Sequence, residues 1–261
     1  GQVPGQPPAA PGANGFNLQE AFVYSWAKFT ANLGPLILAM LIFFAVGVVI
    51  FGLYLGLSLL AVLVGGKSCT TIGGGYYTYE SCTTTGPVAT GLLILITLVF
   101  VVVMVAYAFI IQAGLARVGL ALTAGNPIEA KTLFNKERLG TIVVAGILIA
   151  IPNILGNLVS NTILFVLSIV FYLASIVVVF FSNYFVYYIV DKNMGSVDSI
   201  KASWNFVTQN LASLLALYVL SLAIVFVGAL LCGVGLIVAV PIVVVAQAYA
   251  YRVLNNEPIA A

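Results

Sequence analysis

The sequence predicts an all-α fold, a polytopic membrane helix bundle with six transmembrane helices. The first observation is composition, because 62% of the 261 residues are hydrophobic and 6% are charged, whereas soluble domains carry about 25% charged residues. The second is that the chain contains long windows without any charge. The third is the absence of histidine, the side chain that most often serves as a general base or metal ligand. The first two observations exclude a water-soluble fold, and the third removes the commonest general base and metal ligand. A net charge of +2 gives no reason to expect a nucleic-acid partner.

The charge-free windows define the spans. They cover residues 29–66, 81–116, 139–190 and 202–251. A span needs about 20 apolar residues, so the first two windows hold one span each and the last two hold a pair joined by a turn. The predicted spans, all within a membrane domain at 16–254, are 35–63, 88–115, 139–156, 162–190, 211–230 and 236–252.

The basic residues predict the orientation. With six spans, every Lys and Arg except Lys67 falls on one side of the membrane. Cytoplasmic loops retain positive charge, so we expect both termini in the cytoplasm of a bacterial cell, with the protein in its inner membrane. The segment 64–87 is then an extracytoplasmic loop, and 255–261 is a cytoplasmic C-terminal tail.

Two cysteines lie in the loop that charge places outside. Cys69 and Cys82 flank a glycine-rich tip with Thr and Tyr on either side, a pattern typical of a small hairpin. An oxidising exterior permits a disulfide between them. The alternative is a pair of free thiols in a flexible loop. A metal site is less well supported, because the loop has no histidine to complete the ligand set. Cys232, in a predicted turn, is interpreted as a packing residue.

A short amphipathic helix is predicted before the first span and again before the fifth. Residues 17–32 and 196–210 align at an offset of 178. Identical residues in the two copies are Ser25/Ser203, Trp26/Trp204, Thr30/Thr208, Asn32/Asn210, Leu33/Leu211 and Leu36/Leu214. We interpret both helices as interfacial, with the tryptophans either anchoring them in the membrane surface or contacting a partner or lipid.

A weaker third copy begins at Asn126, Pro127 and Glu129, which form a helix start signal. The chain thus reads as three units, each an interfacial helix followed by a two-span hairpin. The three units run in parallel and not as inverted repeats.

The order of these motifs resembles a known family. The segments that carry the resemblance are Asp191-Lys192-Asn193, Ile200-Lys201-Ala202-Ser203-Trp204, Cys232-Gly233-Val234-Gly235, Pro241 and Ala248-Tyr249-Ala250-Tyr251-Arg252. They resemble the six-span bacterial family related to the membrane domain of glycerophosphodiester phosphodiesterases. The Pro/Gly-rich start of the chain is similar to that of actinobacterial members. The resemblance implies the six-span fold but no phosphodiesterase activity, since no catalytic domain or acid/His metal set accompanies it here.

The predicted membrane interior holds no charged residue, although such residues usually mark ion paths and substrate sites. Asn153, Asn157 and Asn161 recur every four residues and would share one helix face. Their packing inside the bundle is the simpler interpretation, and a polar substrate cavity is the alternative. Gly52 and Gly56 form a GxxxG pair suited to close helix approach.

Aromatic residues crowd the end of the fourth predicted span. They include Phe180, Phe181, Tyr184 and Tyr188 and surround most of the helix, so some rings are expected to face lipid or another protein. Residues 1–15 form a Pro/Gly-rich cytoplasmic tail, which either lies against a protein partner or has no fixed structure.

Three functions are considered. The first is a non-catalytic accessory or scaffold subunit among other integral membrane subunits, with a respiratory electron-transfer supercomplex as the concrete candidate. The second is a carrier or sensor of lipids or other uncharged amphiphiles. The third, an enzyme, is disfavoured because no nucleophile and base pair is found. We predict no catalytic, cofactor-binding or metal-binding residues.

Overall fold

A computed structural model describes residues 16–66, 68–74, 79–83, 85–128, 137–160, 165–231 and 234–260. Six stretches of helix in it are long and apolar enough to cross a membrane, as a multi-pass membrane protein requires. The chain divides into two compact units. Unit 1 contains residues up to 40 together with 109–261, and unit 2 contains 41–108.

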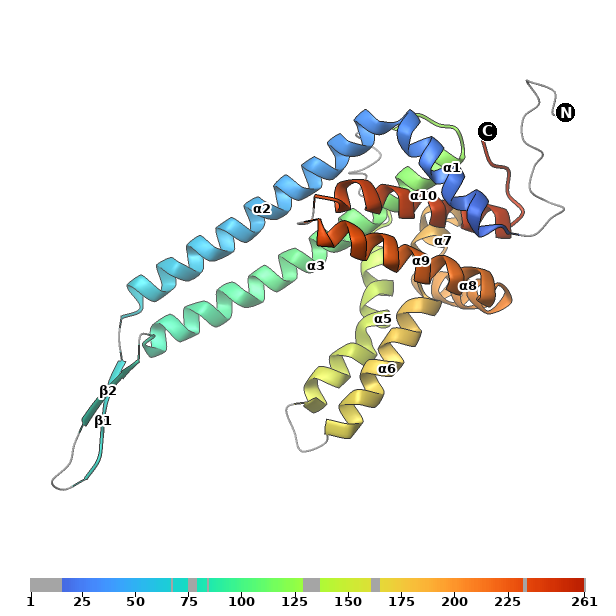
Figure 1. Ribbon diagram of the computed structural model, residues 1–261. Helices are drawn as coiled ribbons and strands as arrows, with labels where there is room; N and C mark the ends of the chain where they lie inside the picture. The colour runs from blue at the N-terminus through green and yellow to red at the C-terminus, as the bar shows by residue number, and fades with distance from the viewer. Residues whose placement is uncertain are drawn as a thin grey trace, which may run out of the picture. The chain divides into compact units, whose positions relative to one another are not determined.

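The elements follow in chain order (Figure 1). They are α1 (Leu18–Ala31), α2 (Leu33–Val64), β1 (Ser68–Ile72), β2 (Tyr79–Thr83), α3 (Pro87–Thr123), α5 (Leu139–Ser160), α6 (Phe165–Phe181), α7 (Phe185–Lys192), α8 (Ser196–Gln209), α9 (Leu211–Leu230) and α10 (Leu236–Leu254).

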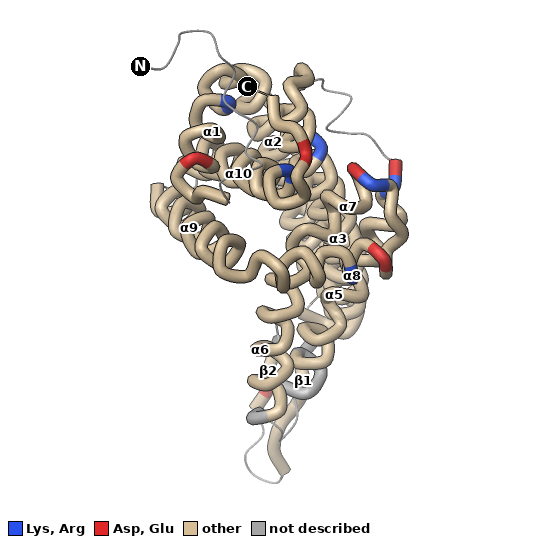
Figure 2. Tube along the Cα trace, turned by 90° about the vertical axis from the view of Figure 1, so that its right-hand side faces the viewer, with Lys and Arg blue, Asp and Glu red and all other residues tan. Residues whose placement is uncertain are grey.

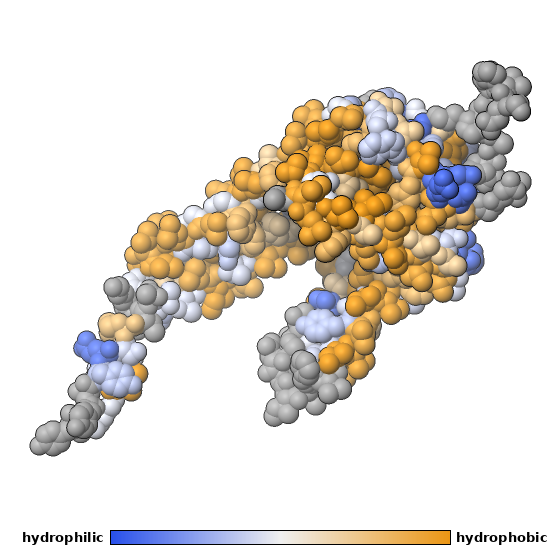
Figure 3. Space-filling view, viewed as in Figure 1, coloured by the Kyte–Doolittle hydropathy of each residue, from blue (hydrophilic) through white to orange (hydrophobic). Residues whose placement is uncertain are grey.

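Unit 2 is a helical hairpin that ends in a two-stranded sheet. Strands β1 and β2 pair antiparallel with Cys69 opposite Cys82, and a disulfide joins these residues with 4.0 Å between their Cα atoms. The predicted disulfide is confirmed. Between the helices, the Tyr107 hydroxyl donates a hydrogen bond to the Phe43 carbonyl. Hydrophobic side chains cover most of the visible face of this helical hairpin (Figure 3), as expected for helices solvated by lipid.

Unit 1 has its core where the ends of several helices meet. Buried residues of α3, α5, α7, α8, α9 and α10 form one cluster, which includes Ile142, Val207, Leu217 and Tyr251. Helices α6 and α9 contain no charged residue. Charged residues of unit 1 lie near the C-terminus and around α7 and α8 (Figure 2).

Helix α3 is longer than the predicted span 88–115. It continues to Thr123, so its 37 residues extend for about 55 Å, well beyond the hydrocarbon thickness of about 30 Å. The extra turns persist because they are packed within unit 1, where Val118, Leu120 and Leu122 are buried. A Cβ placed on Gly119 would lie only 2.9 Å from the Ala248 Cβ, so α3 and α10 are in close contact.

The predicted span 162–190 is not one helix. Helix α6 ends at Phe181 and α7 starts at Phe185. Ser203 of α8 occupies the break: its hydroxyl donates to the Phe181 carbonyl at 2.8 Å and accepts from the Tyr184 amide at 3.1 Å. A side chain from a distant helix thus satisfies backbone groups that a continuous helix would pair internally.

The two described copies of the repeat share detailed geometry. Each amphipathic helix ends at an asparagine, Asn32 or Asn210, with φ and ψ near −122° and 30°. Each asparagine side chain donates to a carbonyl four residues earlier at 3.0 Å. The repeat predicted for α1 and α8 is confirmed in these residues. The third copy is not tested, because Glu129–Lys136 lie outside the described residues.

Candidate functional site

The site begins with helix α1, which packs on α10 and leaves an open groove beside α9. The Asn17 side chain caps the helix by accepting from the Gln19 amide at 2.9 Å. Tyr24 lies against Tyr249 of α10, with 4.9 Å between the ring centroids. These contacts fix the face that α1 presents to α10, and the neighbouring face carries Leu18, Phe22 and Trp26.

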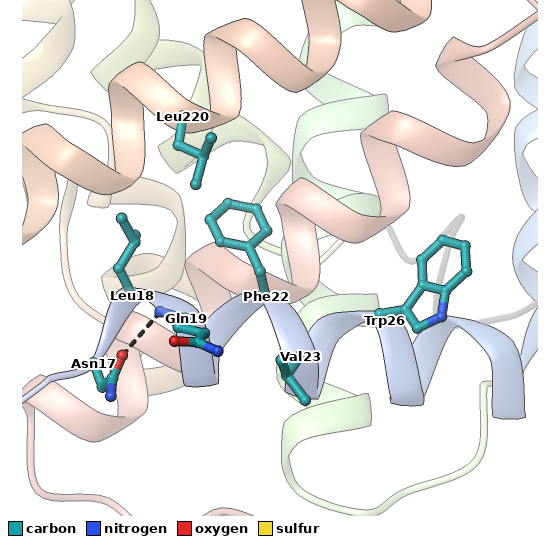
Figure 4. Close-up of a pocket in the computed structure, with 7 residues that line it drawn as sticks. All are labelled: Asn17, Leu18, Gln19, Phe22, Val23, Trp26 and Leu220. Carbon is teal, nitrogen blue, oxygen red and sulfur yellow. Dashed lines mark hydrogen bonds between the residues drawn. The ribbon is translucent and has the colours of Figure 1, made fainter.

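The α1–α9 groove has a volume of about 730 Å³ at its α1 end. Its lining residues are Asn17, Leu18, Gln19, Phe22, Val23, Trp26 and Leu220. Leu18 and Phe22 extend from α1 toward Leu220 of α9, and the Trp26 ring lies farther along the same helix (Figure 4). The polar groups belong to Asn17, Gln19 and the Trp26 indole, while the remaining walls are apolar.

A second hollow, of about 670 Å³, continues the groove along α9 and shares Leu18 and Leu220 with it. Its other lining residues are Ala212, Leu215, Ala216, Val219 and Ala223. From Ala212 to Ala223 the helix rises about 16 Å, which is about half the hydrocarbon thickness. The hollow along α9 therefore has about the length of one membrane leaflet, and the polar groups of α1 lie beside Leu220.

The two repeated tryptophans occupy different surroundings. The Trp204 ring packs on Phe181, with 4.9 Å between centroids, and its indole nitrogen donates to the Ser182 hydroxyl at 3.0 Å. Trp26 is 56% exposed and its indole has no hydrogen-bond partner among the described residues. The two identical residues therefore differ in their hydrogen bonding. The Trp204 indole has a partner, and the Trp26 indole is an available donor.

The predicted aromatic contact surface is corrected at two positions. Tyr184 and Tyr188 are 3% and 7% exposed, so they belong to the core of unit 1 and do not face lipid. The break between α6 and α7 turns these rings inward, where both contact Phe206 of α8. Phe180 and Phe181 remain partly exposed.

The predicted asparagine cavity stays a prediction. Asn153 is exposed on α5 and lines neither part of the α1–α9 groove. The side chain of Asn157 and the whole of Asn161 lie outside the described residues, as do Cys232 and residues 1–15. Helix α5 itself continues through Pro152 to Ser160, past the predicted end of the span at 156.

The predicted C-terminal tail is packed within unit 1 over residues 255–260. The Ala260 amide donates to the Thr123 carbonyl at 2.9 Å, and the Tyr24 hydroxyl donates to the Ala260 carbonyl at 3.1 Å. Glu257 forms ion pairs with Lys192 and Arg252. These contacts join α1, α3, α7 and α10, and sequence reasoning missed them because the partners are distant in the chain.

Burial at this contact changes the acidity of Tyr24. Loss of water around the hydroxyl, together with the nearby Tyr249, raises the pKa of Tyr24 from 10.0 to about 12, while Arg252 acts in the opposite direction. The hydroxyl is thus held in the neutral form that donates to Ala260.

No known family model and no solved structure matches the chain. Among curated proteins, the uncharacterized protein Rv2560 of Mycobacterium tuberculosis is 26% identical to it over 244 residues, which cover 94% of this chain and 70% of that protein. The uncharacterized protein Mb2590 of Mycobacterium bovis matches to the same extent. The likeness extends over nearly the whole chain and carries no assigned activity.

Proposed function

We propose that this protein is a non-catalytic membrane protein that binds a lipid, with one acyl chain in the α1–α9 groove. The observation that carries the proposal is the shape and chemistry of the groove. Its apolar walls extend for about one leaflet, and polar groups gather at the α1 end. An acyl chain would bury the exposed faces of Leu215 and Val219, and the free indole of Trp26 would donate to an oxygen near the glycerol.

The proposed orientation places the start of α9, where the apolar hollow begins, at the inner face of a bacterial cell membrane. All Lys and Arg except Lys67 lie at that face, as the bias of cytoplasmic loops requires. The lipid is therefore drawn from the cytoplasmic leaflet, and both termini are cytoplasmic.

Native mass spectrometry of the full chain, purified in mild detergent, tests lipid binding. We expect retained phospholipid in the wild type and its loss in Ala216→Phe, because the added ring fills the middle of the groove. Ala229→Phe is the matched control, since Ala229 is exposed on the same helix but does not line the groove. Equal lipid retention in the two variants would contradict the proposal.

A second candidate function is that of an accessory or scaffold subunit of a larger membrane assembly, such as a respiratory supercomplex. The exposed surface of α3 favours this function. None of the 18 residues in the most apolar window of α3 is buried within the protein. In addition, a Cβ built on Gly52 or Gly56 of α2 would meet no described atom within 4 Å outside the adjoining backbone. Small residues of this spacing allow another helix to approach closely.

Native electrophoresis after mild solubilisation of the source membranes tests the subunit proposal. We expect the wild type to migrate with other subunits and Gly56→Leu to release it. Gly91→Leu is the control, because this glycine of α3 is also open but lies outside the GxxxG pair. Migration of the wild type as a single chain would exclude the subunit role and leave the lipid proposal standing.

A further inference from the structure

We propose that unit 1 contains a bound water molecule inside the membrane, in a small cavity beside the break between α6 and α7. The cavity is lined by four polar side chains, from Asn183, Tyr184, Tyr218 and Gln247. The remaining walls are the apolar side chains of Phe180, Val207, Leu214 and Leu217. The site is independent of the α1–α9 groove and of the proposed function.

The size of the cavity matches one water molecule. The space open to the centre of a water-sized sphere is about 10 Å³, and about 10–15 Å³ of this measure is needed to hold one water. A larger polar ligand would not fit without movement of the helices.

The polar groups around the cavity lack other partners. Within the described residues, the side chains of Asn183, Tyr184, Tyr218 and Gln247 form no hydrogen bond to one another or to any other group. Tyr184 is only 3% exposed. A buried water usually makes about three hydrogen bonds to groups of this kind, so one molecule here can satisfy several of them together.

The location in the membrane makes an unfilled site costly. Tyr218 lies seven residues after the start of α9 at Leu211, about 10 Å along the helix. Polar groups at this depth cannot exchange hydrogen bonds with bulk water, and leaving them unsatisfied in hydrocarbon is energetically unfavourable.

The helix break explains why the polar groups converge here. Because α6 stops at Phe181 and Ser203 occupies the gap, Asn183 and Tyr184 are released from the regular helix and reach the space between α9 and α10. One water at the α6–α7 break would thus link the residues of the break to Tyr218 of α9 and Gln247 of α10.

X-ray hydroxyl-radical footprinting of the full chain in lipid nanodiscs, read by mass spectrometry, tests the site. Radicals formed from a bound water modify the side chains beside it, so we expect labelling of Tyr218 and Phe180. Tyr54 of α2, which stacks on Phe100 at 4.2 Å between centroids, is the membrane tyrosine that should stay unlabelled. After brief mixing with ¹⁸O water, the label on Tyr218 should still carry ¹⁶O, since an enclosed water exchanges slowly.

Matched variants complete the test. Gln247→Leu should lower the labelling of Tyr218 severalfold, and Gln112→Leu, an exposed span glutamine of α3, should leave it unchanged. Should Gln247→Leu fail to fold, Tyr218→Phe keeps the ring and should reduce the labelling of Phe180. Labelling of Tyr218 no stronger than that of Tyr54, labelling unaffected by Gln247→Leu, or ¹⁸O in the label at the first time point would each overturn the proposal.

Discussion

Ser25 and Ser203 occupy the same position in two copies of a repeat and are both fully buried, yet they have different roles. The Ser25 hydroxyl donates to the Ala21 carbonyl within its own helix at 2.6 Å. The Ser203 hydroxyl instead joins two backbone groups of a broken helix. The difference arises from the neighbouring element, since α10 beside α1 is continuous and α6–α7 beside α8 is not.

The two serines give a matched pair of variants. Ser203→Ala should destabilise the protein by about 1–3 kcal/mol, the cost of leaving a buried backbone group unsatisfied. Ser25→Ala should have little effect. The Ser25 hydroxyl donates a second hydrogen bond to a carbonyl that lies within a regular helix, so its loss leaves no backbone group unsatisfied. Thermal unfolding in detergent measures both. Equal losses of stability would show that Ser203 does not hold the break.

Tyr24 gives a pH prediction. Its pKa in the folded protein is about 12, against 10.0 for the ordinary side chain, so folding favours the neutral hydroxyl. The stabilising contribution of Tyr24 is therefore complete below pH 10 and declines as the pH rises through about 12.

The stability difference between the wild type and Tyr24→Phe, followed from neutral to alkaline pH, measures this contribution. The difference should stay constant up to about pH 10 and shrink above it. A difference that persists unchanged up to pH 12 would contradict the assigned contact between Tyr24 and Ala260.

At the scale of elements, close approach of helices depends on particular glycines. Gly119 of α3 faces Ala248 and the Val244 carbonyl, which would lie 2.9 Å and 3.1 Å from an added Cβ. The carbonyl belongs to the backbone of α10 and cannot turn aside, so this contact tolerates no larger residue without separation of the helices.

Gly119→Val should accordingly cost about 1–3 kcal/mol through overpacking. Gly140→Ala, at an open position near the start of α5, should be neutral or slightly stabilising, because alanine favours helix. Thermal unfolding of the two variants side by side measures the contrast. A neutral Gly119→Val would mean that α3 and α10 are less closely packed than described.

For the whole molecule, the charge distribution predicts the orientation in the membrane. Eight of the nine basic residues, all but Lys67, fall on the side of both termini when the six spans are assigned. The disulfide between Cys69 and Cys82 agrees with an oxidising environment on the opposite side.

Reporter fusions in a bacterial host test this orientation. Green fluorescent protein attached after residue 261 should fluoresce, and alkaline phosphatase at the same place should be inactive. The phosphatase should become active when it is fused within the loop 64–87. The reverse pattern would invert the proposed topology and place the groove in the outer leaflet.

The sequence alone determined the helical class, the approximate position of the spans, the disulfide and the two-copy repeat. These features depend on local composition and short-range periodicity. The boundaries of α9 at Leu211–Leu230 coincide with the predicted span. Asn210 and the turn after Leu230 mark the ends of this helix in the local sequence.

Only the tertiary structure decided the features that depend on which segments meet. It ended α6 at Phe181, extended α3 to Thr123, buried Tyr184 and packed the C-terminal segment against α1. In each case the backbone groups or side chains find partners far away in the chain. The α1–α9 groove has the same origin, since the free face of Trp26 is set by how α1 packs on α10, which no local pattern specifies.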